Sequence, residues 1–381
     1  MKERDKEFMA RALELAERYR GRTSPNPIVG CMIVDARGNV IAEGAHKAAG
    51  KRHAEIEALA KIGYKAPGAT MYVTLEPCTH HGRTPPCIPV VREAGLARVV
   101  IGTEDPVLGH GGGIEALRRV GITVSRALVE ECDAANRPFL TWSLYGRPAF
   151  TLKAAITLDG KIATIKGQSK WITGVPARID VHRLRDTHDA VLVGIGTVLA
   201  DDPWLTVRLA PGRDPTGSVT RGRIPRARDP IRIVLDSKLR TPLDAHLLPK
   251  RKGPRTIIAT TDAAPEAKER ALKKAGAEVW RFPARRNGTV PLEPLVRELG
   301  EQDITSVLVE GGGHVHASFL QFHYADEVII YVAPKVVGGP APSWVGGKGI
   351  ATLQAAHGFR FIEQPIQLGE DLRFRAAMLR P

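Results

Sequence analysis

Helix and strand patterns alternate along residues 1–144. The first twenty residues form an amphipathic pattern, whose apolar side consists of Met9, Leu13, Ala16 and Tyr19. Segments such as ATMYVTL and ARVVIGT are continuously apolar, as expected for strands that helices cover on both faces. The predicted helices are 3–20, 54–62, 86–94, 113–120 and 129–143, and the predicted strands are 28–34, 70–75, 97–102 and 122–126. This order predicts an α/β domain with three layers.

The remaining residues alternate in the same way and predict a second α/β domain. Its predicted strands are 149–156, 190–194, 231–235, 256–260, 277–282, 304–309, 326–333 and 372–379, and its predicted helices are 176–186, 264–275, 291–299 and 313–322. The order suggests a mainly parallel sheet in which a terminal strand or two run the other way. The segment YGRPAF places a glycine and a proline between a helix and a strand, which is typical of a domain boundary. We therefore expect domains at 1–146 and 147–381.

Length and composition favour a soluble protein of two domains. A chain of 381 residues is too long for one ordinary core. Hydrophobic residues make up 43% of the chain and charged residues 25%, as in soluble globular proteins. The longest apolar runs, such as IVGCMIV, are strand-length and too short to span a membrane, and the N-terminal helix lacks the apolar block of a signal peptide. We therefore expect a cytoplasmic protein with no membrane partner.

The formal net charge of +14 favours an anionic partner, such as nucleic acid, a phosphorylated metabolite or an acidic surface. Part of the excess lies at 212–230, a segment rich in glycine, proline and arginine. That composition is typical of a flexible, solvated insertion rather than a dedicated nucleic-acid arm. Charge alone does not choose among these partners.

A candidate metal site combines one histidine with two of the four cysteines. Cys31 and Cys132 stand alone in apolar or helical surroundings, and we expect them to be packing residues. Cys78 and Cys87 lie in the segment EPCTHHGRTPPC, and His53 begins a predicted helix. One imidazole and two thiolates are natural ligands of tetrahedral zinc, and three protein ligands leave the fourth position to water, as in catalytic sites. Zinc lowers the pKa of such a water to about 7.

Glu55 follows His53 by two residues and has a role beside the metal ligands. A glutamate that does not bind the metal takes the proton from the water and passes it to a departing amine. The H-x-E and Pro-Cys patterns are typical of zinc nucleobase deaminases, although the second cysteine stands nine residues beyond the first rather than three. Side chains two apart on a regular helix point about 200° apart. We therefore predict that His53 lies at or before the helix N-cap.

The second half contains two glycine turns and a set of basic residues. Residues 194–197 (GIGT) and 310–313 (EGGG) each follow an apolar strand, where glycine lets backbone N–H groups approach a phosphate. Neither matches the G-x-G-x-x-G fingerprint, and each alone is equally typical of a tight turn. Near strand ends, Lys153, Arg185 and Arg208 suit an anionic ligand, although Arg185 fits a solvated helix surface equally well.

Several strings closely resemble the bifunctional deaminase/reductase family of riboflavin biosynthesis over almost the whole chain. They are TSPNPIVGC, HAEIEAL, YVTLEPCTHHGRTPPC, AAITLDGKIA, SKWITG, GIGTVLADDPWLTVR and VEGGGHVHASFL. The resemblance implies a cytidine-deaminase-like first domain that hydrolyses the 2-amino group of 2,5-diamino-6-(5-phosphoribosylamino)pyrimidin-4(3H)-one. It implies a dihydrofolate-reductase-like second domain that uses NADPH to reduce the ribosyl side chain of 5-amino-6-(5-phosphoribosylamino)uracil to ribityl. Both the substrate and the cofactor are phosphorylated, which accounts for the net positive charge.

The same resemblance assigns site residues. In the first domain it implies His53, Cys78 and Cys87 as zinc ligands, Glu55 as the proton shuttle and Asn26 as a substrate contact. The implied NADPH contacts are Ala155, Trp171, Thr197, Gly312, Gly313, His314 and Val315. The implied substrate contacts of the reductase are Lys153, Ser169, Arg185, Asp201, Leu205, Arg208, Ser237 and Glu310, with Arg185 and Arg208 best suited to the phosphate. The proton that accompanies the hydride has three candidate donors, Lys153, Asp201 and Glu310.

The other polar residues of EPCTHHGRTPPC keep open roles. Glu76 either bonds a substrate amino group or caps a turn, and Arg83 either contacts the phosphate or is solvated. His80 and His81 are expected to face the ribose or phosphate, because two further nitrogen ligands would close the open metal position. The loop at 105–117 departs from the family, whose members usually carry a basic residue between the glycines, so the resemblance does not carry a substrate contact over to this loop.

Two alternatives to this function remain open from the sequence. One is a zinc deaminase that acts on a base in RNA, with the basic second half as a binding module. Aromatic residues are only 5% of the chain and do not cluster with basic ones, so no stacking platform for nucleic acid is expected. The other is a degenerate, purely structural second half, which the intact ADDPWLTVR and VEGGG strings oppose. Exposed sheet edges and the family resemblance lead us to expect a homodimer or larger assembly through the second domain.

Overall fold

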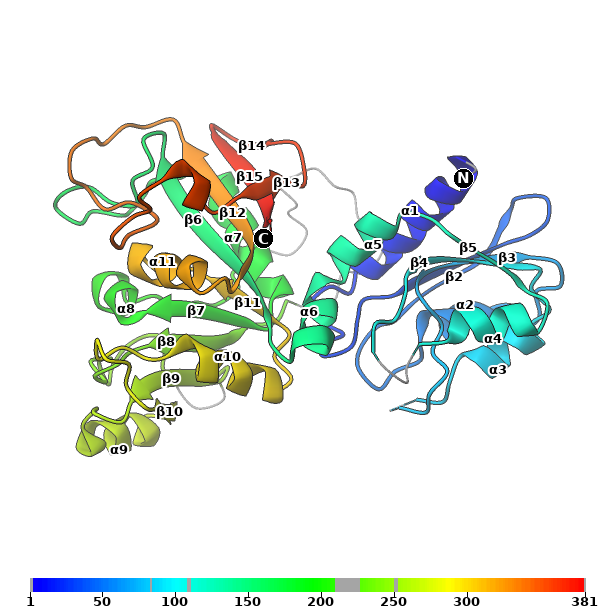
Figure 1. The fold of residues 1–381 in the computed structure, drawn as a ribbon, viewed down its shortest axis with the longest axis horizontal. Helices are drawn as coiled ribbons and strands as arrows, with labels where there is room; N and C mark the ends of the chain where they lie inside the picture. Colours follow the sequence, from blue (N-terminus) through cyan, green and yellow to red (C-terminus); the bar gives the residue numbers. More distant parts are fainter. Residues whose placement is uncertain (1–2, 83, 108–110, 210–226, 250–252, 380–381) are drawn as a thin grey trace. The chain divides into compact units, whose positions relative to one another are not determined.

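The computed structural model describes residues 3–82, 84–107, 111–209, 227–249 and 253–379. The described chain passes from one compact unit to another between Arg147 and Pro148 (Figure 1). Most of the basic insertion at 212–230, Arg83 and part of the 105–117 loop lie outside the described residues. None of the helices in the described ranges has the length and apolar character needed to cross a membrane.

The first unit is built on a five-stranded sheet in the order β2-β1-β3-β4-β5. Strand β1 pairs antiparallel with β2 and β3, whereas β3, β4 and β5 run parallel. The strands are β1 (Gly30–Val34), β2 (Val40–Ala45), β3 (Thr70–Leu75), β4 (Arg98–Thr103) and β5 (Thr123–Arg126). The carboxyl ends of the parallel strands therefore lie at one edge of this sheet.

Helices cover both faces of this sheet, as Figure 1 shows. Side chains of β1 alternate between the two layers: Met32 and Val34 pack with α1 and α5, whereas Cys31 and Ile33 pack with α2, α3 and α4. The helices are α1 (Glu3–Glu17), α2 (Ala54–Ala60), α3 (Ile88–Glu93), α4 (Gly113–Arg119), α5 (Val129–Ala135) and α6 (Arg137–Tyr145). The prediction of a three-layer α/β fold is thus confirmed.

Two features of the first unit differ from the predicted elements. Strand β2 was not predicted, because its sequence VIAEGA is broken by a glutamate and a glycine. The predicted helix at 129–143 is two helices, which separate at Asn136. The buried Asn136 side chain accepts a hydrogen bond from the Ile28 N–H (2.9 Å) and donates one to the Ile28 carbonyl (3.0 Å). This pair of bonds fixes the break and ties it to the start of the sheet.

A close approach at Gly44 sets the position of α2. A Cβ atom at this residue of β2 would lie 2.2 Å from the Ala54 carbonyl oxygen and 2.5 Å from the Ala58 nitrogen. Because no side chain fits there, only glycine lets the first turn of α2 rest directly on the strand. The residue before Ala54 is His53, so this contact also positions the candidate metal ligand.

The second unit has a ten-stranded sheet in the order β10-β9-β8-β7-β11-β6-β12-β15-β13, with β14 also paired to β15. The strands from β10 to β12 are parallel, and β15 runs antiparallel to β12, β13 and β14. The predicted, mainly parallel sheet is confirmed. The strands are β6 (Ala149–Thr157), β7 (Ala190–Gly194), β8 (Ile231–Leu235), β9 (Thr256–Thr261), β10 (Glu278–Phe282), β11 (Ser306–Val309), β12 (Ala325–Ala333), β13 (Phe359–Phe361), β14 (Ile366–Leu368) and β15 (Asp371–Met378).

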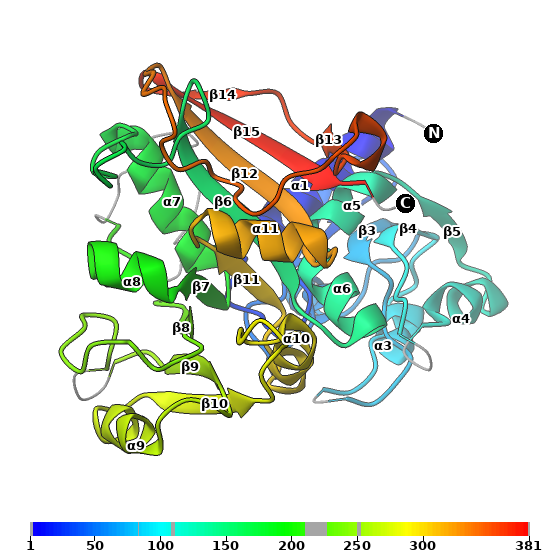
Figure 2. The ribbon, with the colours of Figure 1, turned by 60° about the vertical axis from the view of Figure 1, so that its left-hand side comes forward.

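Helices again cover both faces of the second sheet, with α10 and α11 on one face and α7, α8 and α9 on the other (Figure 2). The helices are α7 (Val175–Thr187), α8 (Ile195–Asp201), α9 (Glu266–Lys274), α10 (Leu292–Glu301) and α11 (Gly313–Gln321), with a 3-10 turn η1 (Leu353–Ala355). The elements α8, η1, β13 and β14 were not predicted, since each is short. The carboxyl ends of the parallel strands share one edge, where open α/β sheets bind their ligands.

Candidate functional site

Three potential metal ligands meet in the first unit. His53 is the N-cap of α2, Cys78 follows β3, and Cys87 is the N-cap of α3. The His53 Nδ1 atom lies 3.2 Å from the Cys87 Sγ and 3.5 Å from the Cys78 Sγ. His53 has extended backbone angles (φ −69°, ψ 162°), which confirms the prediction that it precedes the helix. Within the described ranges, no other set of three His, Cys, Asp or Glu side chains gathers in this way.

The spacing of these atoms fits zinc. Zinc–nitrogen bonds of about 2.0 Å and zinc–sulfur bonds of about 2.3 Å put the nitrogen and sulfur of a tetrahedral site roughly 3.5 Å apart. All three ligand atoms lie within 4.8 Å of one another, and both N···S distances are close to that value. The donor set of one imidazole and two thiols is therefore preorganised for a tetrahedral metal ion with one position left over.

Hydrogen bonds, nearby charges and burial shift the pKa values of the side chains at this centre. A hydrogen bond with Cys87 and the nearby His53 lower the pKa of the Cys78 thiol to about 4, despite its burial. The proton held between the sulfurs raises the pKa of Cys87. Burial raises the pKa of the Glu55 carboxyl, which interacts with the Cys87 thiol and is 3% exposed. Glu55 thus stands beside the ligands as a buried group that takes up a proton more readily than a solvated glutamate.

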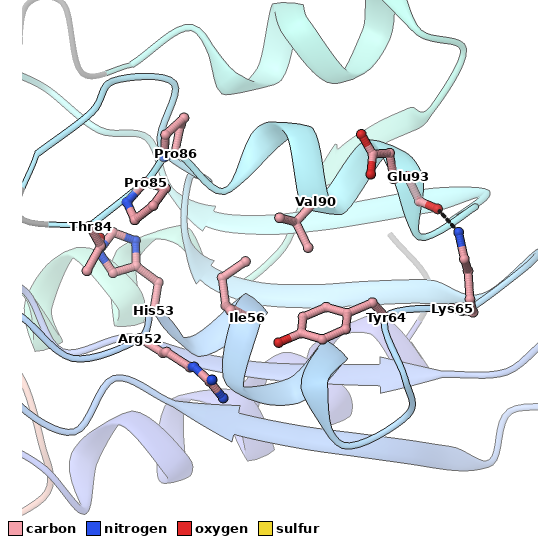
Figure 3. Close-up of a pocket in the computed structure, with 10 residues that line it drawn as sticks. All are labelled: Arg52, His53, Ile56, Tyr64, Lys65, Thr84, Pro85, Pro86, Val90 and Glu93. Atoms are coloured by element: carbon pink, nitrogen blue, oxygen red, sulfur yellow. Dashed lines mark hydrogen bonds between the residues drawn. The ribbon is translucent and has the colours of Figure 1, made fainter.

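Thr84 holds the other side of the His53 ring and was missed from the sequence. Its Oγ1 atom lies 2.9 Å from His53 Nε2. Because Nδ1 faces the two sulfurs, Nε2 carries the ring proton and donates it to the Thr84 hydroxyl, as ligating histidines commonly do with a second partner. Figure 3 shows Thr84 against His53 at one end of a cavity of about 400 Å³ that runs between α2 and α3. In the sequence, only the two prolines that follow Thr84 indicated a loop of restricted conformation.

Asn26 is fixed by His46, a second residue that the sequence did not single out. Asn26 Nδ2 lies 3.2 Å from His46 Nε2, and His46 Nδ1 lies 3.1 Å from the Arg52 carbonyl oxygen. Since a carbonyl only accepts, Nδ1 carries the proton and Nε2 accepts the hydrogen bond from the Asn26 amide. Burial lowers the pKa of His46, which keeps this neutral form. The Asn26 Oδ1 atom is then the part of the amide that can accept a hydrogen bond from a ligand.

The other polar residues of the segment 76–87 divide into structural and exposed groups. Glu76 accepts hydrogen bonds from the Ile114 N–H (2.8 Å) and the Asp105 N–H (3.0 Å), which favours the capping alternative. His80 is half-buried and His81 is exposed. Cys31 and Cys132, the two cysteines outside the cluster, are fully buried in apolar contacts, as predicted.

A buried charge cluster lies near the carboxyl edge of the second sheet. Arg185, in the last turn of α7, donates to both oxygens of Glu310 at 2.6 and 3.0 Å, and Glu310 directly follows β11. Lys153 on β6 places its Nζ 3.7 Å from the same carboxylate. Burial would raise the pKa of Glu310, but the Arg185 and Lys153 charges hold it at about 2. Burial lowers the pKa of Lys153, and the Glu310 charge only partly opposes this.

The side chains predicted to contact the substrate differ in how many of their polar atoms already bind other protein groups. The Arg185 guanidinium also donates to the Thr206 carbonyl (3.2 Å), so its nitrogens bind protein oxygens. Arg208 is exposed, and its Nη1 donates to the Thr206 hydroxyl (3.0 Å). The Ser169 hydroxyl donates to Asp201 at the end of α8 (3.0 Å). Leu205 is buried, and Ser237 lies past the end of β8, away from this cluster.

The glycine turn after β11 leaves room for a phosphate. A Cβ atom at Gly311 would meet Val315 at 2.7 Å and one at Gly313 would meet the Ser343 carbonyl oxygen at 2.5 Å, whereas Gly312 and Gly196 have no atom within 4 Å. The backbone at Gly312 and Gly196 therefore borders open space beside the starts of α11 and α8, as dinucleotide binding requires. The other predicted cofactor contacts lie on β6 (Ala155), in the first turns of α8 and α11 (Thr197, His314, Val315) and at the exposed Trp171.

Family comparisons cover both units. Residues 2–103 match the family described as "Cytidine and deoxycytidylate deaminase zinc-binding region", and residues 148–366 match "RibD C-terminal domain". The "Riboflavin biosynthesis protein RibD" of Actinobacillus pleuropneumoniae is 42% identical over 99% of this chain and 96% of its own length. The protein of that name from Escherichia coli is 41% identical over 94% of this chain and 95% of its own length.

Solved structures give the same result for the fold. RibD of Acinetobacter baumannii superposes with a TM-score of 0.83 at 36% identity and covers 99% of both chains. A "diaminohydroxyphosphoribosylaminopyrimidine deaminase/ 5-amino-6-(5-phosphoribosylamino)uracil reductase" of Thermotoga maritima superposes with a TM-score of 0.82 at 36% identity, again over 99% of both chains. These relatives match the cytidine-deaminase-like and reductase architecture expected from the sequence.

Thr84→Val is expected to weaken zinc binding by roughly 10- to 100-fold, because the variant keeps the side-chain shape but removes the acceptor for His53 Nε2–H. A chelator competition that follows zinc release measures this affinity directly. Thr84→Ser retains the hydroxyl and should bind zinc as the unchanged protein does. Equal zinc affinity in the valine and serine variants would contradict the role of this hydrogen bond.

Proposed function

The chain belongs to the RibD family of bifunctional deaminase/reductases of riboflavin biosynthesis, and from this premise we propose how its residues divide the two reactions. The deaminase half uses zinc and the reductase half uses NADPH. We assign deamination to residues 1–146 and reduction to residues 147–381. The proposed substrates are 2,5-diamino-6-(5-phosphoribosylamino)pyrimidin-4(3H)-one and then 5-amino-6-(5-phosphoribosylamino)uracil, as the name of the Thermotoga maritima relative suggests.

The His53, Cys78 and Cys87 cluster is the observation that carries the deaminase assignment. These three side chains would hold the zinc, which in such sites supplies a water of lowered pKa at the open position. Glu55 accepts a proton from the attacking water and delivers it to the departing amino group. Its buried carboxyl has a raised pKa, which suits both steps because it takes up a proton more readily than a solvated glutamate does.

Asn26 orients the pyrimidine. Its amide nitrogen donates to His46, so its Oδ1 accepts a hydrogen bond from a ring N–H or amino group of the substrate. His46 therefore fixes which end of the amide the substrate meets. His80 and His81 are assigned to the ribose and phosphate side, because neither belongs to the ligand cluster. Arg83, the further phosphate candidate, lies outside the described residues.

Reduction needs a hydride, which NADPH supplies, and a proton for the opened ribose carbonyl or imine. Lys153 is the best donor of that proton, because it is buried and burial lowers its pKa. Glu310 is held as an anion by Arg185 and Lys153, so it orients the lysine rather than acting as an acid. Asp201 already accepts a hydrogen bond from Ser169, which suits a positioning role.

The remaining contacts divide between phosphate and cofactor. We assign the substrate phosphate to Arg208, since the Arg185 guanidinium is occupied by Glu310 and Thr206. Leu205 and Ser169 line the substrate side. The dinucleotide contacts are assigned to Ala155, Trp171, Thr197, Gly312, Gly313, His314 and Val315. Of these, Thr197 follows the open backbone at Gly196, and Gly313, His314 and Val315 follow that at Gly312. A planar Arg178 guanidinium 4.4 Å from the Trp171 ring centre supports that exposed indole.

Glu55→Gln is expected to keep about one zinc per chain and to lower ammonia release by roughly 10²- to 10⁴-fold, because it removes the proton carrier but none of the ligands. Zinc content and ammonia release are measured on the same preparation. Glu57→Gln, on the same helix but paired with Lys47, is the matched control and should retain the activity. Full ammonia release by Glu55→Gln would exclude the proposed role.

Lys153→Met is expected to lower kcat for reduction by roughly 10²- to 10⁴-fold. In the unchanged protein, reduction should decline on the alkaline side as Lys153 loses its proton. A lowered pKa places this decline below the ordinary lysine value of about 10.4. The profile is obtained from NADPH absorbance with the deaminated substrate across pH. As a control, Arg208→Ala should raise KM for that substrate and keep the alkaline decline. An alkaline decline that persists in Lys153→Met would assign the proton to another group.

We also propose a homodimer through the second unit. Strand β13 forms an edge of the ten-stranded sheet, and apolar side chains are exposed near it, including Phe361 (68%) and Leu353 (91%). Exposed strand edges and apolar patches of this kind are typical of interfaces. Light scattering after size-exclusion chromatography should give a mass twice that of one chain. Phe361→Asp should lower this mass towards that of a single chain. Elution of the unchanged protein as a monomer at micromolar concentration would contradict the proposal.

We place the protein in the cytoplasm. All four cysteines are free, and Cys78 and Cys87 must stay reduced to serve as ligands. Cell fractionation tests this assignment, and recovery in an oxidising compartment would contradict it.

A further inference from the structure

Three side chains that are charged or titratable converge on Thr206 in the second unit. The Thr206 carbonyl oxygen accepts a hydrogen bond from Arg185 Nη1 (3.2 Å) and lies 3.1 Å from His182 Nδ1. The Thr206 hydroxyl accepts a hydrogen bond from Arg208 Nη1 (3.0 Å). Arg185 and Arg208 were expected from the sequence to contact the substrate phosphate, whereas His182 was not singled out. His182 thus shares its anchor, Thr206, with both of these arginines.

The helix α7 places His182 and Arg185 on the same side. They are three residues apart, so their side chains are neighbours on the helix surface. Ala177 and Val181 face the sheet instead and pack in a buried cluster with Tyr331 of β12. His182 is only half-buried, and no group in the described part of the chain bonds its Nε2 atom. The Nε2 side of the ring is therefore open to a ligand.

Positive charge dominates the surroundings of His182. Burial lowers the pKa of this imidazole to about 4, together with the charges of Arg185 and Arg208. Two carboxylates oppose these charges: Glu310 is engaged by Arg185 through both oxygens, and Asp229 attracts Arg208. His182 is therefore neutral near pH 7 in the free protein. An anion that bound beside the arginines would offset their charge and favour the protonated imidazole.

The contact with Thr206 determines which ring nitrogen of neutral His182 carries the proton. A carbonyl oxygen only accepts hydrogen bonds, so Nδ1 carries the proton and donates it to Thr206. The Arg208 backbone N–H also approaches Nδ1, but at the longer distance of 3.3 Å. Nε2 then has a lone pair, which would repel the oxygens of a phosphate. His182 can bond a phosphate only as the imidazolium, in which both ring nitrogens donate.

We propose that His182 binds the substrate phosphate together with Arg208 and takes up a proton from solvent as the phosphate arrives. In the complex, Nε2–H donates to a phosphate oxygen while Nδ1–H keeps its bond to Thr206. A phosphate monoester carries a charge of about −1.5 to −2 near pH 7, and at hydrogen-bond distance such a charge raises the pKa of an imidazole. This role rests on the proposed reductase function, which assigns the substrate phosphate to Arg208.

The pH dependence of KM for the deaminated substrate, measured at saturating NADPH, tests this role. Because phosphate binding raises the pKa of His182, the added affinity is present below the pKa of the complex and is lost as pH rises through it. KM should therefore rise roughly three- to tenfold between about pH 6.5 and 8.5. The substrate charge changes little over this range, which lies above the second pKa of a phosphate monoester, about 6.

His182→Gln should remove this rise, because the glutamine side chain does not titrate. Its KM should stay constant within about twofold, near the value of the unchanged protein at high pH, and its kcat should be retained. Thermal melting checks that the variant is folded.

His357→Gln, which replaces a histidine just before β13, is the matched control and should keep the full rise. Persistence of the rise in His182→Gln, or its absence from the unchanged protein, would overturn the role of His182 and leave the reductase function intact. If the unchanged protein oxidised no NADPH with this substrate, the proposed reductase function and the role of His182 would both fail.

Discussion

The deaminase centre depends on the position of one residue, His53, at the junction between extended chain and helix. Two side chains separated by one residue on a regular helix would diverge by about 200°, so an imidazole and a carboxylate could not serve the same point. The extended backbone at the N-cap turns the imidazole towards Cys78 and Cys87, while Glu55 remains within the first turn of α2. Gly44 makes this possible, since it lets α2 begin directly against β2.

At both centres, neighbouring groups stabilise a buried negative charge. In the first unit, the hydrogen bond with Cys87 and the nearby His53 stabilise the thiolate form of Cys78. In the second, Glu310 is compensated by Arg185 and Lys153. Removing one partner of such a buried pair costs about 3–5 kcal/mol, because the remaining charge is left without compensation. The charged groups at each centre are therefore interdependent in stability as well as in chemistry.

Long periodic elements were predictable, and short ones were not. A buried parallel strand such as β7 has a continuous apolar sequence, so its position followed from its residues alone. Strand β2 pairs with the neighbouring β1, but its sequence VIAEGA lacks a regular apolar pattern, and helix α8 has only seven residues. The break at Asn136 has a different cause, since its side chain bonds to Ile28 far earlier in the chain.

The metal ligands and Glu55 were predictable because their residue types are uncommon in that combination and their chemistry is specific. Their supporting residues were not: Thr84 and His46 are identified by hydrogen bonds to ring nitrogens and amides, and nothing in their local sequence marks them. The same limit applied to Arg185. The family resemblance assigned it to the substrate phosphate, and its ion pair with Glu310 was not predicted.

One chain performs deamination and then reduction, each reaction at its own centre. The most direct measurement supplies zinc-loaded protein with the diaminopyrimidine phosphate and NADPH, and follows ammonia and NADPH absorbance separately over time. Ammonia should appear first, and NADPH consumption should follow after a lag, as the deaminated intermediate accumulates. Consumption of NADPH without ammonia release, or the absence of both signals, would contradict it.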